Sequence, residues 1–71
     1  MSDFGNGQQV IWDMGNGKAR GTIADRFNRK VARRIRDRIV TRYGSPDDPA
    51  YLIKQDDGSE VLMFGSELRQ V

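Results

Sequence analysis

The sequence has 71 residues, enough for one domain and too few for a second core. It contains no cysteine and no histidine, which excludes a disulfide framework, thiolate or imidazole zinc sites and histidine-dependent catalysis. The net charge of +2 conceals a strong asymmetry, because residues 26–42 hold eight basic residues against Asp37 alone. Residues 1–25 and 43–71 are both net acidic.

Length and hydropathy indicate a single small domain. No apolar stretch approaches the roughly 20 residues that a membrane-spanning helix requires, and there is no signal-peptide pattern. A domain of this size buries only about 60% of the surface that its unfolded chain exposes, so nearly every large apolar side chain is needed in the core. We therefore expect one cytoplasmic domain over residues 1–71, with residues 1–7 flexible and no membrane association.

The first half of the chain begins with two predicted strands. Within residues 8–14, Val10, Trp12 and Met14 recur at every second position, the pattern of a half-buried strand. Residues 15–17, Gly-Asn-Gly, tolerate the positive φ angles of a tight hairpin turn. The second predicted strand, residues 18–25, contains Gly21, which permits a bulge or a close approach of backbone at the corner of a small barrel.

The segment from Phe27 to Tyr43 fits two structures. Apolar residues recur every four positions: Phe27, Val31, Ile35 and Ile39. This spacing suits one stripe of a helix, and arginine is a good helix former. The segment also fits two strands. Val31, Arg33 and Ile35 would lie on one face of the first strand, alternating with residues 32, 34 and 36 on the other, and residues 39–43 are rich in β-branched and aromatic side chains. A turn at residues 36–38 would then join the strands, and the residues alone leave helix and hairpin equally open.

The second half alternates turns with short strands. Residues 44–49 contain a glycine and two prolines and are predicted to form a loop. A strand at 50–55 leads to an Asp-Asp-Gly-Ser turn at 56–59. Residues 61–64 form a strand that is apolar on both faces, after which Ser66 is predicted to cap a short helical turn. Five or six short strands at regular spacing indicate a barrel or sandwich.

Three stretches of the sequence together resemble a known family. They are Val10-Ile11-Trp12 with Gly15-Asn16-Gly17 and Gly21, then Thr41 to Ile53, which reads T-R-Y-G-S-P-D-D-P-A-Y-L-I, and finally Gly58 to Leu68. Their order and spacing cover nearly the whole chain and are similar to those of the hypervirulence-associated Tudor-domain proteins. Met14 and Tyr43 depart from the family pattern, which commonly has an aromatic residue and an asparagine there.

The resemblance implies an all-β fold, a small SH3-like or Tudor-like barrel of five to six antiparallel strands with a short C-terminal helical turn. It favours the hairpin for residues 27–43. It implies no particular ligand, because this fold hosts many functions. The predicted core consists of large side chains on the strands: Val10, Trp12, Ile23, Tyr51, Ile53 and Leu62.

The arginine-rich segment is the main candidate site. Guanidinium groups match phosphate and carboxylate oxygens, and a dense positive patch attracts anionic partners. The candidate residues for contact with a protein partner or a nucleic acid are Arg33, Arg34, Arg36, Arg38 and Arg42. Two further interpretations assign these charges no ligand. They protect the hairpin edge from aggregation, or they pair with the protein's own acidic loops.

An aromatic cage for a methylated lysine or arginine requires two or three converging rings. The candidate rings are Trp12, Phe27, Tyr43, Tyr51 and Phe64. Core packing is the preferred interpretation for Trp12, Tyr51 and Phe64, since so small a domain needs their volume inside. Phe4 and Tyr43 are expected to be exposed.

The carboxylates give little indication of chemistry. The loop residues Asp47, Asp48, Asp56 and Asp57 lack the spacing of a known calcium loop, and a domain this small offers little room for a catalytic cleft between Asp13, Asp25 and Glu67. We expect no catalytic residue, no metal, no cofactor and no small-molecule substrate. The predicted function is a non-catalytic interaction module that binds a protein, and the alternative is sequence-tolerant binding of RNA or DNA backbone through the hairpin 26–42.

Overall fold

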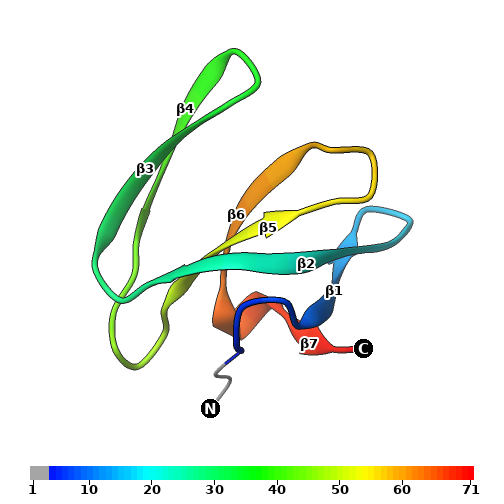
Figure 1. Cartoon of the computed structure of the whole chain (residues 1–71), viewed down its shortest axis with the longest axis horizontal. Coiled ribbons are helices and arrows are strands. Elements are labelled where there is room, and N and C mark those ends of the chain that lie inside the picture. The colour runs from blue at the N-terminus through cyan, green and yellow to red at the C-terminus, as the bar shows by residue number, and fades with distance from the viewer. Residues whose placement is uncertain (1–3) are drawn as a thin grey trace.

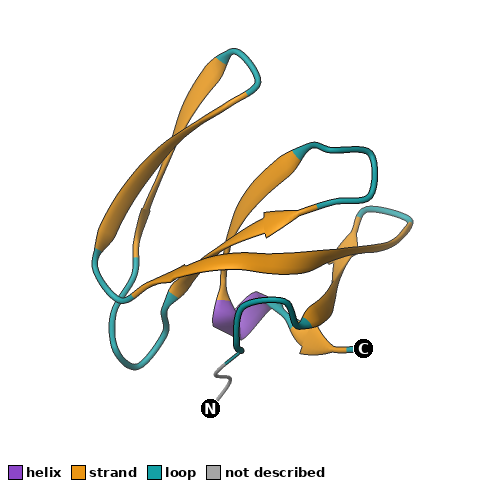
Figure 2. Cartoon of the chain, in the orientation of Figure 1, coloured by secondary structure: helices purple, strands orange, loops and turns teal. Residues whose placement is uncertain are grey.

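The structure, a computed structural model, describes residues 4–71 of the chain. These residues form seven strands and one short 3₁₀-helix, shown in Figures 1 and 2. In chain order they are β1 (Gln9–Met14), β2 (Gly17–Phe27), β3 (Lys30–Ile35), β4 (Arg38–Tyr43), β5 (Ala50–Lys54), β6 (Glu60–Phe64), η1 (Gly65–Glu67) and β7 (Arg69–Gln70). Within residues 4–71 there is no helix with the length and apolar character needed to cross a bilayer.

Every strand pairing in the described part of the chain is antiparallel, which confirms the predicted all-β class. One sheet has the order β6-β5-β2-β1-β7, and β3 pairs with β4 in a separate hairpin. The segment that fitted either a helix or a hairpin is therefore a hairpin. The two-residue strand β7, which pairs with β1 at Val10 and Ile11, was not predicted.

The long strand β2 organises the larger sheet. Its first half, up to Thr22, pairs with β1, and its second half, from Thr22 to Phe27, pairs with β5. The register shifts between Ile23 and Asp25, which marks a β-bulge. A bulge bends a strand and increases its twist, so β2 passes from one pairing partner to the other across the molecule (Figure 1).

The core consists of two clusters on opposite faces of β5 and β6. Alternate residues of a strand point to opposite faces. Tyr51 and Ile53 therefore enter the first cluster, whereas Ala50 and Leu52 join the second, which packs toward the β3–β4 hairpin. This arrangement explains why the sequence of β6 is apolar on both faces.

All six residues predicted for the core are buried: Val10, Trp12, Ile23, Tyr51, Ile53 and Leu62. The expectation that Phe4 is exposed is wrong, because only 8% of Phe4 is accessible. Its ring packs edge-on against Tyr51 with 5.5 Å between centroids, and its N–H donates to the Tyr51 hydroxyl. Part of the predicted flexible segment, residues 1–3, lies outside the described residues, whereas Gly7 N–H donates to the Ile23 carbonyl.

The helical turn after β6 is present, but Ser66 does not cap it. Ser66 lies inside η1, and its N–H and hydroxyl donate to the two carboxylate oxygens of Asp48 at 2.9 and 2.8 Å. At the start of the turn, the Phe64 N–H donates instead to the carboxylate of Glu67. Through these hydrogen bonds Asp48 links the loop at 44–49 to η1, two segments that are distant in sequence.

A prediction concerns Gly21, which sits where β2 approaches β5. An added Cβ would lie 2.5 Å from Ile53 Cγ2 and 2.9 Å from the Lys54 carbonyl oxygen. We expect Gly21→Ala to lower the free energy of unfolding by about 1–3 kcal/mol, because a rigid backbone oxygen must shift. Chemical denaturation measures the loss. Gly17→Ala is the matched control in the same strand, since nothing lies within 4 Å of its added Cβ, and equal stability of the two variants would contradict the close approach.

Candidate partner-binding hairpin

The β3–β4 hairpin stands beside the main sheet, with its tip directed away from it (Figure 1). Its strands are joined by the two-residue turn Arg36-Asp37, which follows the pair Ile35↔Arg38. The base of the hairpin is fixed where the chain returns toward β5. There the Gly44 N–H donates to the Arg29 carbonyl, and a Cβ on Gly44 would meet the Phe27 carbonyl oxygen.

Residues directly opposite each other in an antiparallel ladder point to the same face. The inner face of the hairpin packs toward β6 and holds Val31, Arg33, Ile35, Arg38, Val40 and Arg42. The outer face holds Lys30, Ala32, Arg34, Ile39, Thr41 and Tyr43. The arginines that the sequence grouped as one contact surface are thus divided between two faces and the turn.

Two inner-face arginines, Arg33 and Arg42, have contacts within this protein that orient their side chains. The guanidinium carbon of Arg33 lies 4.9 Å from the centroid of the Phe27 ring, close enough for a cation–π interaction. Arg29 lies over the same ring at 5.7 Å. Arg33 and Arg42 each also donate to a backbone carbonyl on their own strand. These contacts orient the side chains, and no carboxylate within residues 4–71 forms an ion pair with either arginine.

No basic residue from Arg29 to Arg42 forms an ion pair with a carboxylate within residues 4–71, where the ion pairs are those of Asp13. The interpretation in which the hairpin pairs with the protein's own acidic loops therefore has no support among the described residues. Arg36 does have a longer-range electrostatic interaction with Asp57. Hydrogen bonds from Ser59 are the main reason that the pKa of Asp57 lies below 3.8, and the charge of Arg36 adds to the effect.

The turn residue Arg36 has an unusual backbone conformation. Its φ of +60° is the only positive φ of a non-glycine residue among residues 4–71. The other two hairpins place Gly15 and Gly58 at their positive-φ positions. A left-handed conformation costs an L-residue about 1–2 kcal/mol, so an arginine is kept here at some expense of stability. Its charged side chain is exposed at the tip.

An open groove lies between the inner face and β6. It has a volume of about 210 Å³ and is lined by Ile35, Val40, Arg42, Val61, Leu62 and Met63. All of its lining residues except Arg42 are apolar. The groove could not be predicted from the sequence because it depends on which strand the hairpin covers, although the two apolar faces of β6 indicate that a second layer packs there.

The aromatic residues do not form a cage among the described residues. Four of the five candidate rings are buried or half-buried: Trp12, Phe27, Tyr51 and Phe64. Tyr43 is 68% exposed, as expected, and stands on the outer face with the Lys30 ammonium 5.5 Å from its centroid. A single exposed ring beside a lysine cannot enclose a methylated cation.

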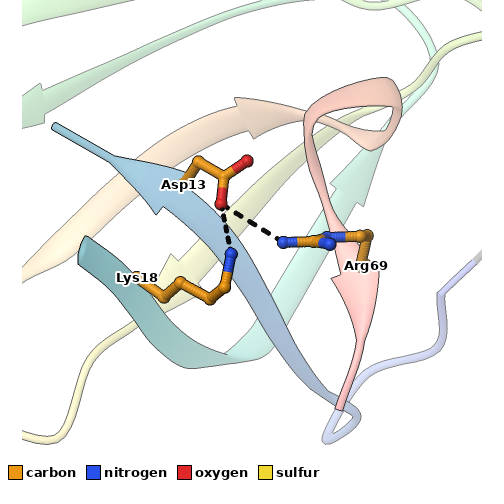
Figure 3. Close-up of polar contacts among 3 residues, drawn as sticks. All are labelled: Asp13, Lys18 and Arg69. Atoms are coloured by element: carbon orange, nitrogen blue, oxygen red, sulfur yellow. Dashed lines mark hydrogen bonds and ion pairs between the residues drawn. The ribbon is translucent and has the colours of Figure 1, made fainter. Parts of the chain in front are cut away.

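The carboxylates considered for catalysis are each engaged in local structure. Asp13 accepts from Lys18 at 2.7 Å and from Arg69 at 3.2 Å, as Figure 3 shows. Asp25 accepts a hydrogen bond from the N–H of Arg26, and Glu67 accepts one from the N–H of Phe64 at the start of η1. Within residues 4–71, no group of three or more acidic side chains is placed to hold a metal ion.

A family model described as the Tudor domain of hypervirulence-associated proteins matches residues 7–68. This match confirms the resemblance seen in the sequence, and together with the antiparallel strands it confirms the predicted Tudor-like fold class. No curated protein and no solved structure matches the chain.

A prediction follows from the ion pairs of Asp13. The hydrogen bond from Lys18, aided by the charges of Lys18 and Arg69, lowers the pKa of Asp13 from 3.8. A carboxyl with a lower pKa in the folded state stabilises the fold above its unfolded pKa, and this stabilisation is lost as the pH falls through the folded pKa. We expect the melting temperature of Asp13→Asn to depend less on pH below 3.8 than that of the wild type. Lys18→Gln should flatten the profile in the same direction, and parallel profiles for all three proteins would contradict this assignment.

A second prediction concerns Arg36. Replacement by glycine, which adopts positive φ without strain, should raise the free energy of unfolding by about 0.5–1 kcal/mol. Arg36→Ala is the control, because it removes the same charge but keeps the Cβ. Denaturant titration distinguishes the two causes. A gain in both variants would assign the effect to charge repulsion instead of backbone strain.

Proposed function

Because the chain belongs to the Tudor-domain family of hypervirulence-associated proteins, we propose that it is a non-catalytic interaction module whose β3–β4 hairpin contacts a protein partner. Tudor domains are generally non-catalytic binding modules. The observation that carries the proposal is a hairpin that combines basic side chains, which form no ion pair within residues 4–71, with two exposed apolar side chains, Ile39 and Tyr43.

The composition of the outer face supports a protein partner. Ile39 is 64% exposed and lies opposite Arg34, and Tyr43 is 68% exposed and lies opposite Lys30. Aromatic, aliphatic and arginine side chains are typical of the centre of protein interfaces, where aromatic residues and arginine are enriched and lysine is depleted. Side chains of this kind contribute most to binding affinity when an apolar surface of the partner covers them and its carboxylates form ion pairs with the guanidinium groups.

The division of the arginines gives less support to the nucleic-acid alternative. A protein that follows a phosphate backbone presents its cations as a stripe along one surface. Here Arg33, Arg38 and Arg42 share the inner face beside apolar side chains, whereas Arg34 lies on the outer face and Arg36 in the turn, so the five arginines do not form one continuous stripe. Binding of oligonucleotides by such an arrangement is expected to be weak and easily screened by salt.

The proposal predicts how the domain behaves with a labelled 20-nucleotide single-stranded DNA. We expect fluorescence anisotropy to detect weak binding at 20 mM salt and none at 150 mM. A random 12-residue peptide display library should instead give sequences that bind the wild type at 150 mM salt. The triple variant Arg34→Glu, Arg36→Glu, Arg38→Glu should lose them.

The control is the pair of substitutions Lys18→Gln and Arg20→Gln on β2, which removes two positive charges outside the hairpin and should leave peptide binding within twofold of the wild type. DNA binding that persists at 150 mM salt and disappears in the triple variant would replace the proposal with the nucleic-acid alternative. Failure of the library to yield any peptide selective for the wild type over the triple variant would also overturn it.

A further inference from the structure

We infer that the groove between the inner face of the hairpin and β6 receives one large apolar side chain from an acidic segment of the protein partner. This inference rests on the proposed function. It identifies the groove as the binding site and gives the chemistry of the partner segment that binds there. Three properties of the groove support it: its position at a strand edge, its size and the charge around it.

The position follows from the lining of β6. Val61, Leu62 and Met63 are consecutive, and their side chains alternate between the two faces of the sheet. Lining by three consecutive residues fits a groove that runs along the edge of their strand, where side chains from both faces are accessible. β6 is a terminal strand of the five-stranded sheet, with β5 as its neighbour on one side. The groove therefore lies along a sheet edge, where extended peptides commonly dock and place alternate side chains in pockets.

The size favours a single side chain over a small molecule. A cavity of about 150 Å³ lined by aliphatic residues binds benzene, whereas sites for drug-sized ligands have about 300–1,000 Å³. At about 210 Å³, the groove has room for a phenylalanine or leucine side chain and not for a cofactor. Five apolar lining residues match such a side chain, and burial of its apolar surface there is favourable.

The charge favours an acidic partner segment. Arg42 lines the groove, and Arg33 and Arg38 share the inner face with Ile35 and Val40. None of these arginines forms an ion pair within residues 4–71, and no carboxylate lines the groove. An apolar anchor flanked by aspartate or glutamate would fill the groove and supply the missing counterions in one contact, with the bidentate geometry that arginine prefers.

The test uses peptides selected from the same display library on the wild-type domain. We expect them to share one large apolar residue flanked by Asp or Glu. Val40→Glu places a carboxylate in the groove and should weaken their binding at least tenfold. Met14→Glu is the control, because it introduces the same charge at an exposed apolar residue on β1, outside the hairpin, and it should weaken binding less than threefold.

Val40 belongs to the second core cluster, so a second variant covers the case in which Val40→Glu unfolds. Arg38→Glu with Arg42→Glu reverses the charge and leaves all apolar lining residues in place, and it should also weaken binding at least tenfold. Amide spectra of the wild type with the strongest peptide should show the largest shifts at Val61 and Met63.

Distinct outcomes would overturn the inference and leave the proposed function intact. Peptides that lose binding in Ile39→Glu but keep it in Val40→Glu would move the contact to the outer face. Selected peptides without an acidic residue would refute the charge argument. A wild-type dimer in sedimentation that Val40→Glu converts to a monomer would identify the occupant as a second copy of this chain. Displacement of the peptides by single-stranded DNA at 150 mM salt, with the groove signals shifting, would assign the groove to nucleic acid.

Discussion

The need to cover both faces of β5 is the constraint on which the rest of the structure depends. Tyr51 and Ile53 point into one cluster, and Ala50 and Leu52 point into the other. In so small a domain the larger sheet closes over the first cluster alone, because β2 bends at its bulge to reach both β1 and β5. The second cluster would face water without the β3–β4 hairpin, so burial of apolar surface holds this hairpin against β6.

The cover that the hairpin provides is incomplete, and this incompleteness creates the candidate site. At the base, Val31 and Phe27 are buried, and the close approach at Gly44 fixes the chain. Toward the tip, Ile35 and Val40 are only partly buried and line the open groove. The side chains of the hairpin are therefore well packed at its base and less well packed toward its tip. Arg34, Arg36 and Arg38 lie at this tip, where they have few contacts with the rest of the domain.

The sequence was sufficient for β1, β2, β5 and β6, for most turns and for the core, since period-two alternation and glycine at positive-φ turns are local signals, whereas the residues alone left β3 and β4 open between helix and hairpin and gave no sign of β7. It was not sufficient for features that depend on contacts distant in sequence. Phe4 stands alone in a polar segment, yet it is buried because Tyr51 offers a ring and a hydroxyl. Ser66 looked like a helix cap, but Asp48 accepts both of its donors. Which face of the hairpin each arginine occupies depends on the register of the two strands, and the position of the two-residue turn determines that register.

Protection of an edge from aggregation explains only part of the hairpin. That interpretation accounts for the arginines, because charge on an exposed strand discourages pairing with another chain. It does not account for Ile39 and Tyr43, which expose large apolar surfaces on the same strand, or for an arginine held at φ +60° where glycine fits without strain. Each of these three features costs stability or solubility in the isolated domain. The proposed partner, by covering the apolar side chains and supplying carboxylates to the arginines, accounts for the exposed Ile39 and Tyr43 and for a charged residue at the turn together, which protection of the edge does not.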